Sequence, residues 1–204
     1  MPLFRSKAEA KVREAGYDPA RLPPGQYFTE KWPVLHAGGV PDVDIATWTL
    51  RVWGEVENEV TLTYDELRAL PATEVTTDIH CVTRWSRFDA RFTGVRWREL
   101  AKLCNPKVSA RFVIAHAEHG FTANSPLPAI ADDDNALVVY DADGAPLTPD
   151  HGWPARLFVP SKYFWKSAKW LTGLEITAAD KPGFWERYGY NNDADYWKEE
   201  RYSF

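Results

Sequence analysis

The chain has 204 residues, of which 45% are hydrophobic and 14% are aromatic, with ten tryptophans among them. This length and apolar content suit one domain with a real hydrophobic core, so we expect residues 1–204 to form a single domain. The formal net charge of −5 and the lack of a long basic run exclude a general nucleic-acid binder.

The beginning of the chain and the cysteine count bear on its location. Residues 1–14 are rich in charge, without the apolar core of a secretory signal or a twin-arginine pair. No apolar run approaches the ~20 residues that a membrane-spanning helix needs. The two cysteines, Cys81 and Cys104, do not amount to a disulfide framework. We therefore predict a cytoplasmic protein without a membrane partner.

The first predicted elements are a short helix and an extended arm. Residues 6–16 suit a helix that ends at Gly16, and prolines between residues 19 and 24 force the following chain to extend. We therefore predict an N-terminal arm over residues 1–30. Two glycines and two prolines surround His36 in the next stretch, which is typical of a loop whose backbone approaches a ligand, or of a plain surface loop.

Short strands dominate the rest of the chain. Alternation over residues 47–56 predicts a strand, and Thr63 with Glu66 forms a capping box that begins a short helix. Further strands are predicted over residues 60–62, 73–81, 111–117, 136–140, 155–159 and 173–177, with a helical turn at 127–130. The tail over residues 180–204 is poor in aliphatic residues and is predicted to wrap the surface. This pattern indicates a sheet-dominated α+β fold.

A helix is predicted over residues 97–104. Trp97, Leu100, Leu103 and Cys104 share one face of it, so Cys104 is expected in the core.

The end of the strand before residue 81 carries the most distinctive chemistry. The stretch Thr77–Trp85 offers His80, Cys81, Thr83 and Arg84 almost in succession. A thiolate can act as a nucleophile or bind a soft metal, although a buried cysteine is more often an inert small hydrophobe.

A basic group follows later in the chain. It comprises Arg156, Lys162, Lys166 and Lys169, with Ser161 and Ser167 nearby. Together with backbone amides these side chains can hold a phosphate, and the alternative is a solvated face. Tryptophans at 165 and 170 interleave with the lysines, which favours a site.

The histidines raise a different possibility. The five are His36, His80, His116, His119 and His151. Several of them can be combined into a zinc site, although neither a His-Glu-x-x-His nor a Cys-x-x-Cys motif occurs. Glycine-rich phosphate loops and hydrolase nucleophile elbows are also absent.

Three segments carry a family resemblance. Residues 78–86, 151–157 and 166–170 resemble the molybdenum-cofactor domain of the sulfite oxidase family, in particular its small stand-alone bacterial members. The similarity runs from about residue 36 to the C-terminus. It implies a sheet-dominated α+β fold of the molybdopterin-binding type, and a molybdenum atom held by one molybdopterin.

The resemblance also implies roles for individual residues. Cys81 takes the place of the cysteine that ligates molybdenum, and a soft thiolate suits this dithiolene-bound metal. His36 and His151 take the places of residues that contact the pterin. The cofactor's remaining contacts, including those to its phosphate, are assigned to Arg156, Ser167, Ala168 and Lys169.

The residues after Cys81 differ from those of sulfite oxidases proper, which carry Gly-Asn-Arg-Arg there and bind sulfite with those arginines. Here Val82, Thr83, Arg84 and Trp85 follow. In extended geometry the Arg84 side chain would lean over the metal and orient a substrate oxygen, whereas the alternative pairs Arg84 with Asp78 or Asp89.

The chain is therefore predicted to be a molybdopterin-dependent oxidoreductase that transfers an oxygen atom, with two electrons, to or from a small-molecule substrate. A separate electron-transfer partner of unknown identity is expected. The alternatives are a zinc-dependent hydrolase and a non-catalytic, tryptophan-rich binding domain.

Overall fold

The structure is a computed structural model that describes residues 2–203. Its strands are β1 (Tyr27–Phe28), β2 (Thr49–Gly54), β3 (Val60–Thr63), β4 (Ala72–His80), β5 (Trp85–Arg96), β6 (Phe112–Ala117), β7 (Thr122–Pro126), β8 (Leu137–Ala142), β9 (Ala145–Pro146), β10 (Arg156–Phe158) and β11 (Leu171–Thr177). Its α-helices are α1 (Pro2–Glu14), α2 (Tyr64–Ala69), α3 (Trp97–Cys104), α4 (Pro128–Ala131) and α5 (Phe184–Arg187). Short 3-10 turns are η1 (Pro19–Arg21), η2 (Glu118–Gly120), η3 (Pro149–His151) and η4 (Phe164–Lys166).

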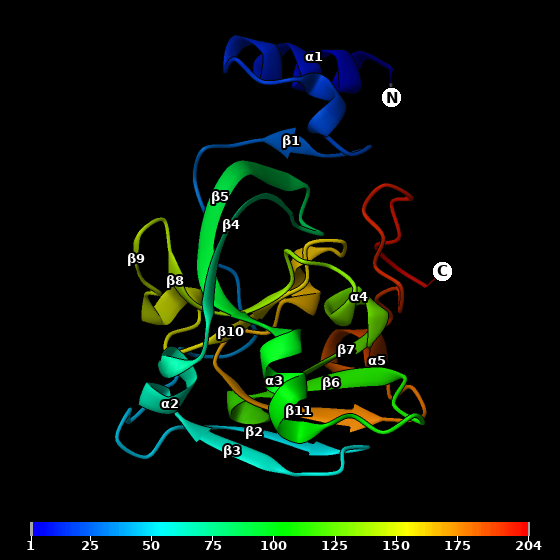
Figure 1. The fold of residues 1–204 in the computed structure, drawn as a ribbon. Helices are drawn as coiled ribbons and strands as arrows, with labels where there is room; N and C mark the ends of the chain where they lie inside the picture. Colours follow the sequence, from blue (N-terminus) through cyan, green and yellow to red (C-terminus); the bar gives the residue numbers. More distant parts are fainter. Residues whose placement is uncertain (1, 204) are drawn as a thin grey trace.

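The strands form two sheets, as predicted for a sheet-dominated α+β fold. The first sheet has the order β1-β5-β8-β10, with β4 added on β5 and β9 on β8, and the second has the order β3-β2-β11-β6-β7. Figure 1 shows the second sheet at the base of the molecule and the long β4–β5 hairpin rising away from it. The main core contains buried residues of both sheets and of α3, for example Leu50, Leu100, Leu157 and Leu174. Burial of these apolar side chains holds the two layers together.

The β4–β5 hairpin positions the chemistry found in the sequence. The strands pair from Ala72 with Val95 to His80 with Ser86, so the hairpin ends at the turn that Cys81 begins. Strand β4 was predicted from the sequence, whereas β5 was not. Side chains of β5 alternate between buried and more exposed from Phe88 to Thr93, with charged residues on the outer face. Its period-2 pattern was therefore readable, but the apolar residues are too dispersed to form a run.

Most other predicted elements are confirmed within a few residues, including the capping box in which Thr63 Oγ1 accepts from the Glu66 amide. Some details differ. The short strands β1, β7 and β9 were not predicted. Leu103 is 39% exposed, although Trp97, Leu100 and Cys104 are buried. The face of α3 that packs on the core is therefore narrower than the predicted one.

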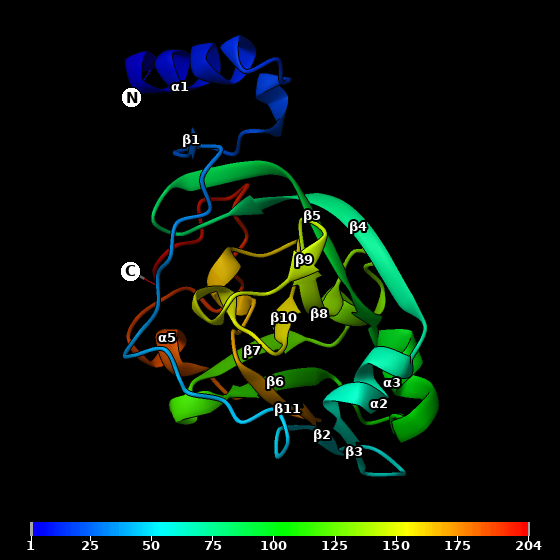
Figure 2. The same cartoon turned by 90° about the vertical axis from the view of Figure 1, so that its left-hand side faces the viewer.

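Both ends of the chain lie against the turn of the β4–β5 hairpin. β1 pairs in parallel with the start of β5, Tyr27 with Trp85 and Phe28 with Ser86. Figures 1 and 2 show α1 above this end of the hairpin, and Figure 1 shows the red C-terminal tail beside it. No helix within residues 2–203 is long and apolar enough to cross a membrane.

Candidate active site

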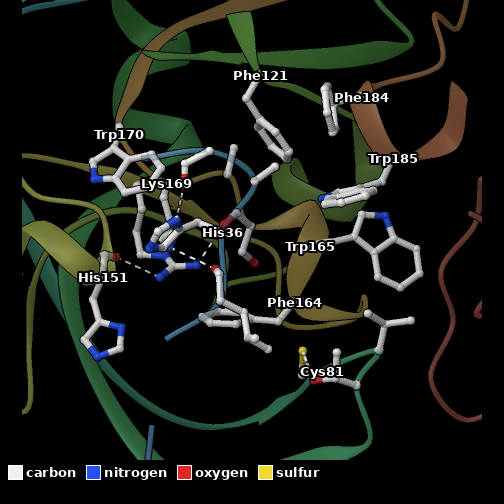
Figure 3. Close-up of a pocket in the computed structure, with 18 of the residues that line it drawn as sticks. His36, Cys81, Phe121, His151, Phe164, Trp165, Lys169, Trp170, Phe184 and Trp185 are labelled. Carbon is white, nitrogen blue, oxygen red and sulfur yellow. Dashed lines mark hydrogen bonds between the residues drawn. The ribbon is translucent and has the colours of Figure 1, made fainter. Parts of the chain in front are cut away.

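A cavity of about 540 Å³ lies between the hairpin turn, the loop before β2, the segment from η4 to β11, and α5. This volume suits a small molecule or a cofactor. In Figure 3, Cys81 lies toward one end of the cavity, whereas Lys169 and Trp170 lie on the other side of the view. The cavity therefore has a thiol end and a cationic end.

Cys81 provides the thiol. Its residue is 8% exposed, and its Sγ accepts a hydrogen bond from Thr83 Oγ1 at 3.2 Å. Burial raises the pKa of the Cys81 thiol, while the hydrogen bonds from Thr83 and the charge of Arg201 oppose this shift. The thiol is consequently protonated at neutral pH until a metal ion displaces the proton.

Arg156 is the most buried cation of the site. Its residue is 2% exposed, Nη1 donates to His151 O, and Nη2 donates to Ser167 O, each at 2.8 Å. Burial lowers the pKa of Arg156 to about 9, and its Nε has no hydrogen-bond partner within the described part of the chain. A buried guanidinium with an unused donor is costly, so its environment fits an additional acceptor.

Lys169 adds a second cation. Its Nζ donates to Leu35 O at 3.0 Å and to Asp150 O at 2.9 Å, and it lies 4.5 Å from the centre of the Trp170 ring. Burial, and then the charge of Arg156, lower the pKa of Lys169 to about 7. An anion in the cavity would therefore stabilise the charged form of this lysine.

The two predicted histidines also line the cavity. His151 stacks on Trp32 with ring centroids 3.9 Å apart, and burial lowers the pKa of His151 to about 4, so the ring is neutral at pH 7. His36 Nδ1 donates to Gly38 O at 2.7 Å, which fixes the orientation of that ring.

The structure brings seven of the eight predicted site residues to the cavity: His36, Cys81, His151, Arg156, Ser167, Ala168 and Lys169. Ser167 Oγ accepts a hydrogen bond from the Val159 amide at 3.0 Å, which positions the segment that also contains Ala168. The predicted basic group is divided. Lys166 forms a buried ion pair with Glu186 at 2.6 Å, and Lys162 does not line the cavity.

Arg84 is the exception, and the prediction that it leans over the metal is corrected. The residue is exposed, has a left-handed φ of 78°, and does not line the cavity. Its amide donates to Cys81 O at 2.9 Å, so residues 81–84 form a tight turn and not the extended segment that the prediction assumed. The predicted alternative also fails, because Arg21 binds both Asp78 and Asp89, at 2.6 and 2.5 Å.

The cavity has an aromatic wall, of which the sequence predicted only a part, the tryptophans at 165 and 170. The wall consists of Trp32, Trp85, Phe121, Phe164, Trp165, Trp170, Phe184, Trp185 and Tyr190. Figure 3 shows Phe121, Phe184, Trp185 and Trp165 on the side of the cavity away from His151. The high tryptophan content was a signal for a lined pocket, but it did not show which rings would converge.

The predicted zinc alternative has no assembled donor set. Within residues 2–203 no group of three His, Cys, Asp or Glu side chains is placed to hold a metal ion. His116 is engaged by Glu175 at 3.0 Å, and His80 by Ser86 at 2.8 Å. A single thiol suits a metal whose other ligands come from a cofactor.

The comparison with known families identifies the class. The model of the oxidoreductase molybdopterin-binding domain matches residues 37–185, and the chain belongs to this family. It is a molybdopterin-dependent oxidoreductase of the sulfite oxidase family, and its cofactor is molybdenum–molybdopterin. The predicted family, enzyme class and cofactor are thereby confirmed, and the non-catalytic alternative is not.

Individual relatives differ in length. The chain is 45% identical to the uncharacterized oxidoreductase YuiH of Bacillus subtilis (strain 168), over 90% of this chain and 92% of that protein. It is 31% identical to the putative protein-methionine-sulfoxide reductase subunit YedZ1 of Azospira oryzae, over 74% of this chain and 57% of the relative. It is 27% identical to mitochondrial sulfite oxidase of Rattus norvegicus, over 82% of this chain but only 37% of that protein.

A solved structure shows the same fold. The sulfane dehydrogenase SoxCD from Paracoccus pantotrophus matches with a TM-score of 0.66 at 21% identity, over 76% of this chain and 43% of that one.

The cavity residues fit this cofactor. Cys81 offers a soft ligand to a soft metal, and the cationic end offers charge-assisted donors to a phosphate. The unpartnered Nε of Arg156 is the observation that favours an anionic occupant.

Proposed function

We propose that this protein transfers an oxygen atom, with two electrons, between a small-molecule substrate and a molybdenum centre ligated by Cys81. The observation that supports this most directly is the position of the two cysteines. Cys81 lines the cavity, whereas Cys104 is fully buried in the main core. Only one of the chain's cysteine thiols is therefore placed to bind a metal in the cavity.

Arg156 and Lys169 are the proposed anchors of the cofactor's phosphate, because hydrogen bonds between charged groups are about twice as strong as neutral ones. His36 and His151 would contact the pterin through their rings. The neutral ring of His151 offers one donor and one acceptor, which suits the mixed donors and acceptors of the pterin. Ser167 and Ala168 would contribute through the backbone between the two cations.

When bound, the cofactor supplies the two-electron redox chemistry at its metal. The role of the chain is to hold the metal through Cys81 and to keep the metal's surroundings apolar with the aromatic wall. Excluding water in this way strengthens electrostatic interactions inside the cavity. The electrons would be exchanged with a separate partner. The cytoplasmic location expected from the sequence stays a prediction.

Metal analysis of the purified protein tests the proposal. We expect about one molybdenum per chain together with one releasable pterin, in keeping with a single thiolate ligand. Stoichiometric zinc, or neither metal nor pterin, would contradict it. Activity is then tested in both directions, with sulfite as oxygen acceptor and with an organic sulfoxide as oxygen donor, because two relatives are named for such substrates.

A further inference from the structure

The turn that carries Cys81 is held by side chains from both ends of the chain. Gln26 and Arg201 are 1% and 6% exposed, although one lies in the N-terminal arm and the other in the C-terminal tail. Neither lines the cavity. Buried polar side chains of this kind are nearly always hydrogen-bonded, so their partners show what they hold in place.

Gln26 binds the base of the turn. Its Nε2 donates to Cys81 O at 3.0 Å and to Trp85 O at 3.2 Å, so one amide group joins the two residues that flank the turn. The β1 pairing immediately after Gln26 places it there, since the Tyr27 amide donates to Arg84 O at 2.7 Å.

Arg201 binds the other side. Its Nη1 donates to Val82 O at 2.6 Å, and its Nη2 donates to Gln26 Oε1 at 3.0 Å. The guanidinium also lies 4.9 Å from the centre of the Tyr163 ring, which fixes its plane. Gln26 and Arg201 thus form one network, in which each supports the other's contact with the turn.

We propose that Gln26 and Arg201 are positioning residues that together hold the Cys81 sulfur at the place in the cavity where the metal is bound. Docking of both chain ends is then a condition for correct ligation. The same tail contributes Trp185 and Tyr190 to the aromatic wall, so its docking also completes the cavity. This inference rests on the proposed role of Cys81 as the metal ligand.

The test measures how well the turn protects the sulfur. Cofactor-free full-length protein is treated with iodoacetamide at one fixed pH, and alkylation of Cys81 and Cys104 is followed separately by peptide mass spectrometry. Gln26→Leu removes the side-chain amide that donates to Cys81 O and Trp85 O. Arg201→Lys keeps the positive charge but loses the planar guanidinium, whose two Nη atoms donate to Val82 O and Gln26 Oε1. Lys198→Gln is the matched control, because the Lys198 side chain is 69% exposed and forms ion pairs with Asp195 and Glu200 of the same tail.

We expect Cys81 alkylation to accelerate about fivefold or more in Gln26→Leu and Arg201→Lys, since a lost buried hydrogen bond raises the population of locally open states by this order. Cys104 should stay protected in all variants, and Lys198→Gln should match the parent. In the molybdenum-loaded proteins, the thiolate-to-molybdenum charge-transfer absorption should be weaker or shifted in the two network variants at equal metal content.

Unchanged Cys81 alkylation in both network variants would overturn the inference. A parallel acceleration at Cys104 would overturn it as well, because the residues would then support the fold in general. A parent protein that holds molybdenum without any thiolate charge-transfer band would instead refute the proposed function, whatever the alkylation rates show.

Discussion

Cys81 and Cys104 form a natural pair for comparison, since both are buried free thiols but only Cys81 lines the cavity. We expect Cys81→Ser to abolish turnover while much of the pterin remains, because the contacts at the cationic end persist. Cys104→Ser should keep nearly full turnover and lose about 1–3 kcal/mol of stability, since it places a hydroxyl in the main core. Activity, pterin fluorescence and chemical denaturation distinguish the two, and identical behaviour would refute the assignment of Cys81.

The lowered pKa of Lys169 leads us to expect that cofactor retention depends on pH. The pKa of Lys169 is lowered to about 7 by burial and by Arg156, with Asp150 opposing, so the lysine is charged below about pH 7 and neutral above it. A phosphate favours the charged form, and its binding above this pH therefore requires proton uptake. Affinity should fall as pH rises beyond 7, by at most about tenfold per unit.

The measurement is the pterin retained after dialysis at about pH 6 and about pH 8, on either side of the lysine's pKa. Lys169→Met should retain less pterin at the lower pH and show a flatter pH dependence than the parent. Lys162→Met is the control, since Lys162 does not line the cavity. A parental pH dependence in Lys169→Met would remove Lys169 from the anchoring role.

At the scale of elements, the pairing of β5 with β8 depends on a glycine. A Cβ on Gly94 would lie 2.2 Å from Val138 O, at the position where the register of the two strands shifts. The contacting atom belongs to the backbone of β8, so it cannot move aside by a change of side-chain rotamer. We expect Gly94→Ala to lower the free energy of unfolding by about 1–3 kcal/mol.

Gly39→Ala is the control for this substitution, because a Cβ there would meet nothing within 4 Å. Chemical denaturation of both variants measures the effect. Equal stability of the two would mean that the β5–β8 pairing tolerates the added methyl group, contrary to the geometry.

At the scale of the whole molecule, a buried ion pair connects the C-terminal tail, through Glu186 on α5, to Lys166 on η4. Lys166 and Glu186 have side chains that are 1% and 3% exposed, and Lys166 Nζ also donates to Asn124 Oδ1 on β7 at 2.9 Å. Burial lowers the pKa of Lys166, while Glu186 opposes the shift. Lys166→Met leaves an unpaired buried carboxylate, so we expect it to cost about 3–5 kcal/mol of stability.

Adding Glu186→Gln to Lys166→Met should restore part of this loss, because the second change removes the unpaired charge. The exposed pair Arg51–Glu59 provides the control, and Glu59→Gln should change stability by less than about 1 kcal/mol. Chemical unfolding curves of the parent, Lys166→Met, the double variant and Glu59→Gln measure these stability differences. A double variant less stable than Lys166→Met alone would show that the charge is not the dominant cost.

Much of the fold was predictable because local patterns agree with the final structure. The capping box at Thr63, the strands around residues 50 and 157, and the burial of Cys104 all follow from residues close together in the chain. Strand β5 was missed although its buried and exposed residues alternate, which is the same kind of pattern that predicted the strand around residue 50. The predicted single domain, with an arm over residues 1–30 and a tail over 180–204, stays a prediction.

The sequence by itself determined the family and seven residues that line the cavity, because three spaced motifs carry six of them and the loop before β2 carries the seventh, His36. Tertiary structure alone decided the rest. The turn after Cys81 directs Arg84 away from the cavity, and the aromatic wall gathers rings from residue 32 to residue 190. Contacts between residues so far apart in the chain depend on the backbone angles of every turn between them. A local pattern of residue types does not specify all of these angles together.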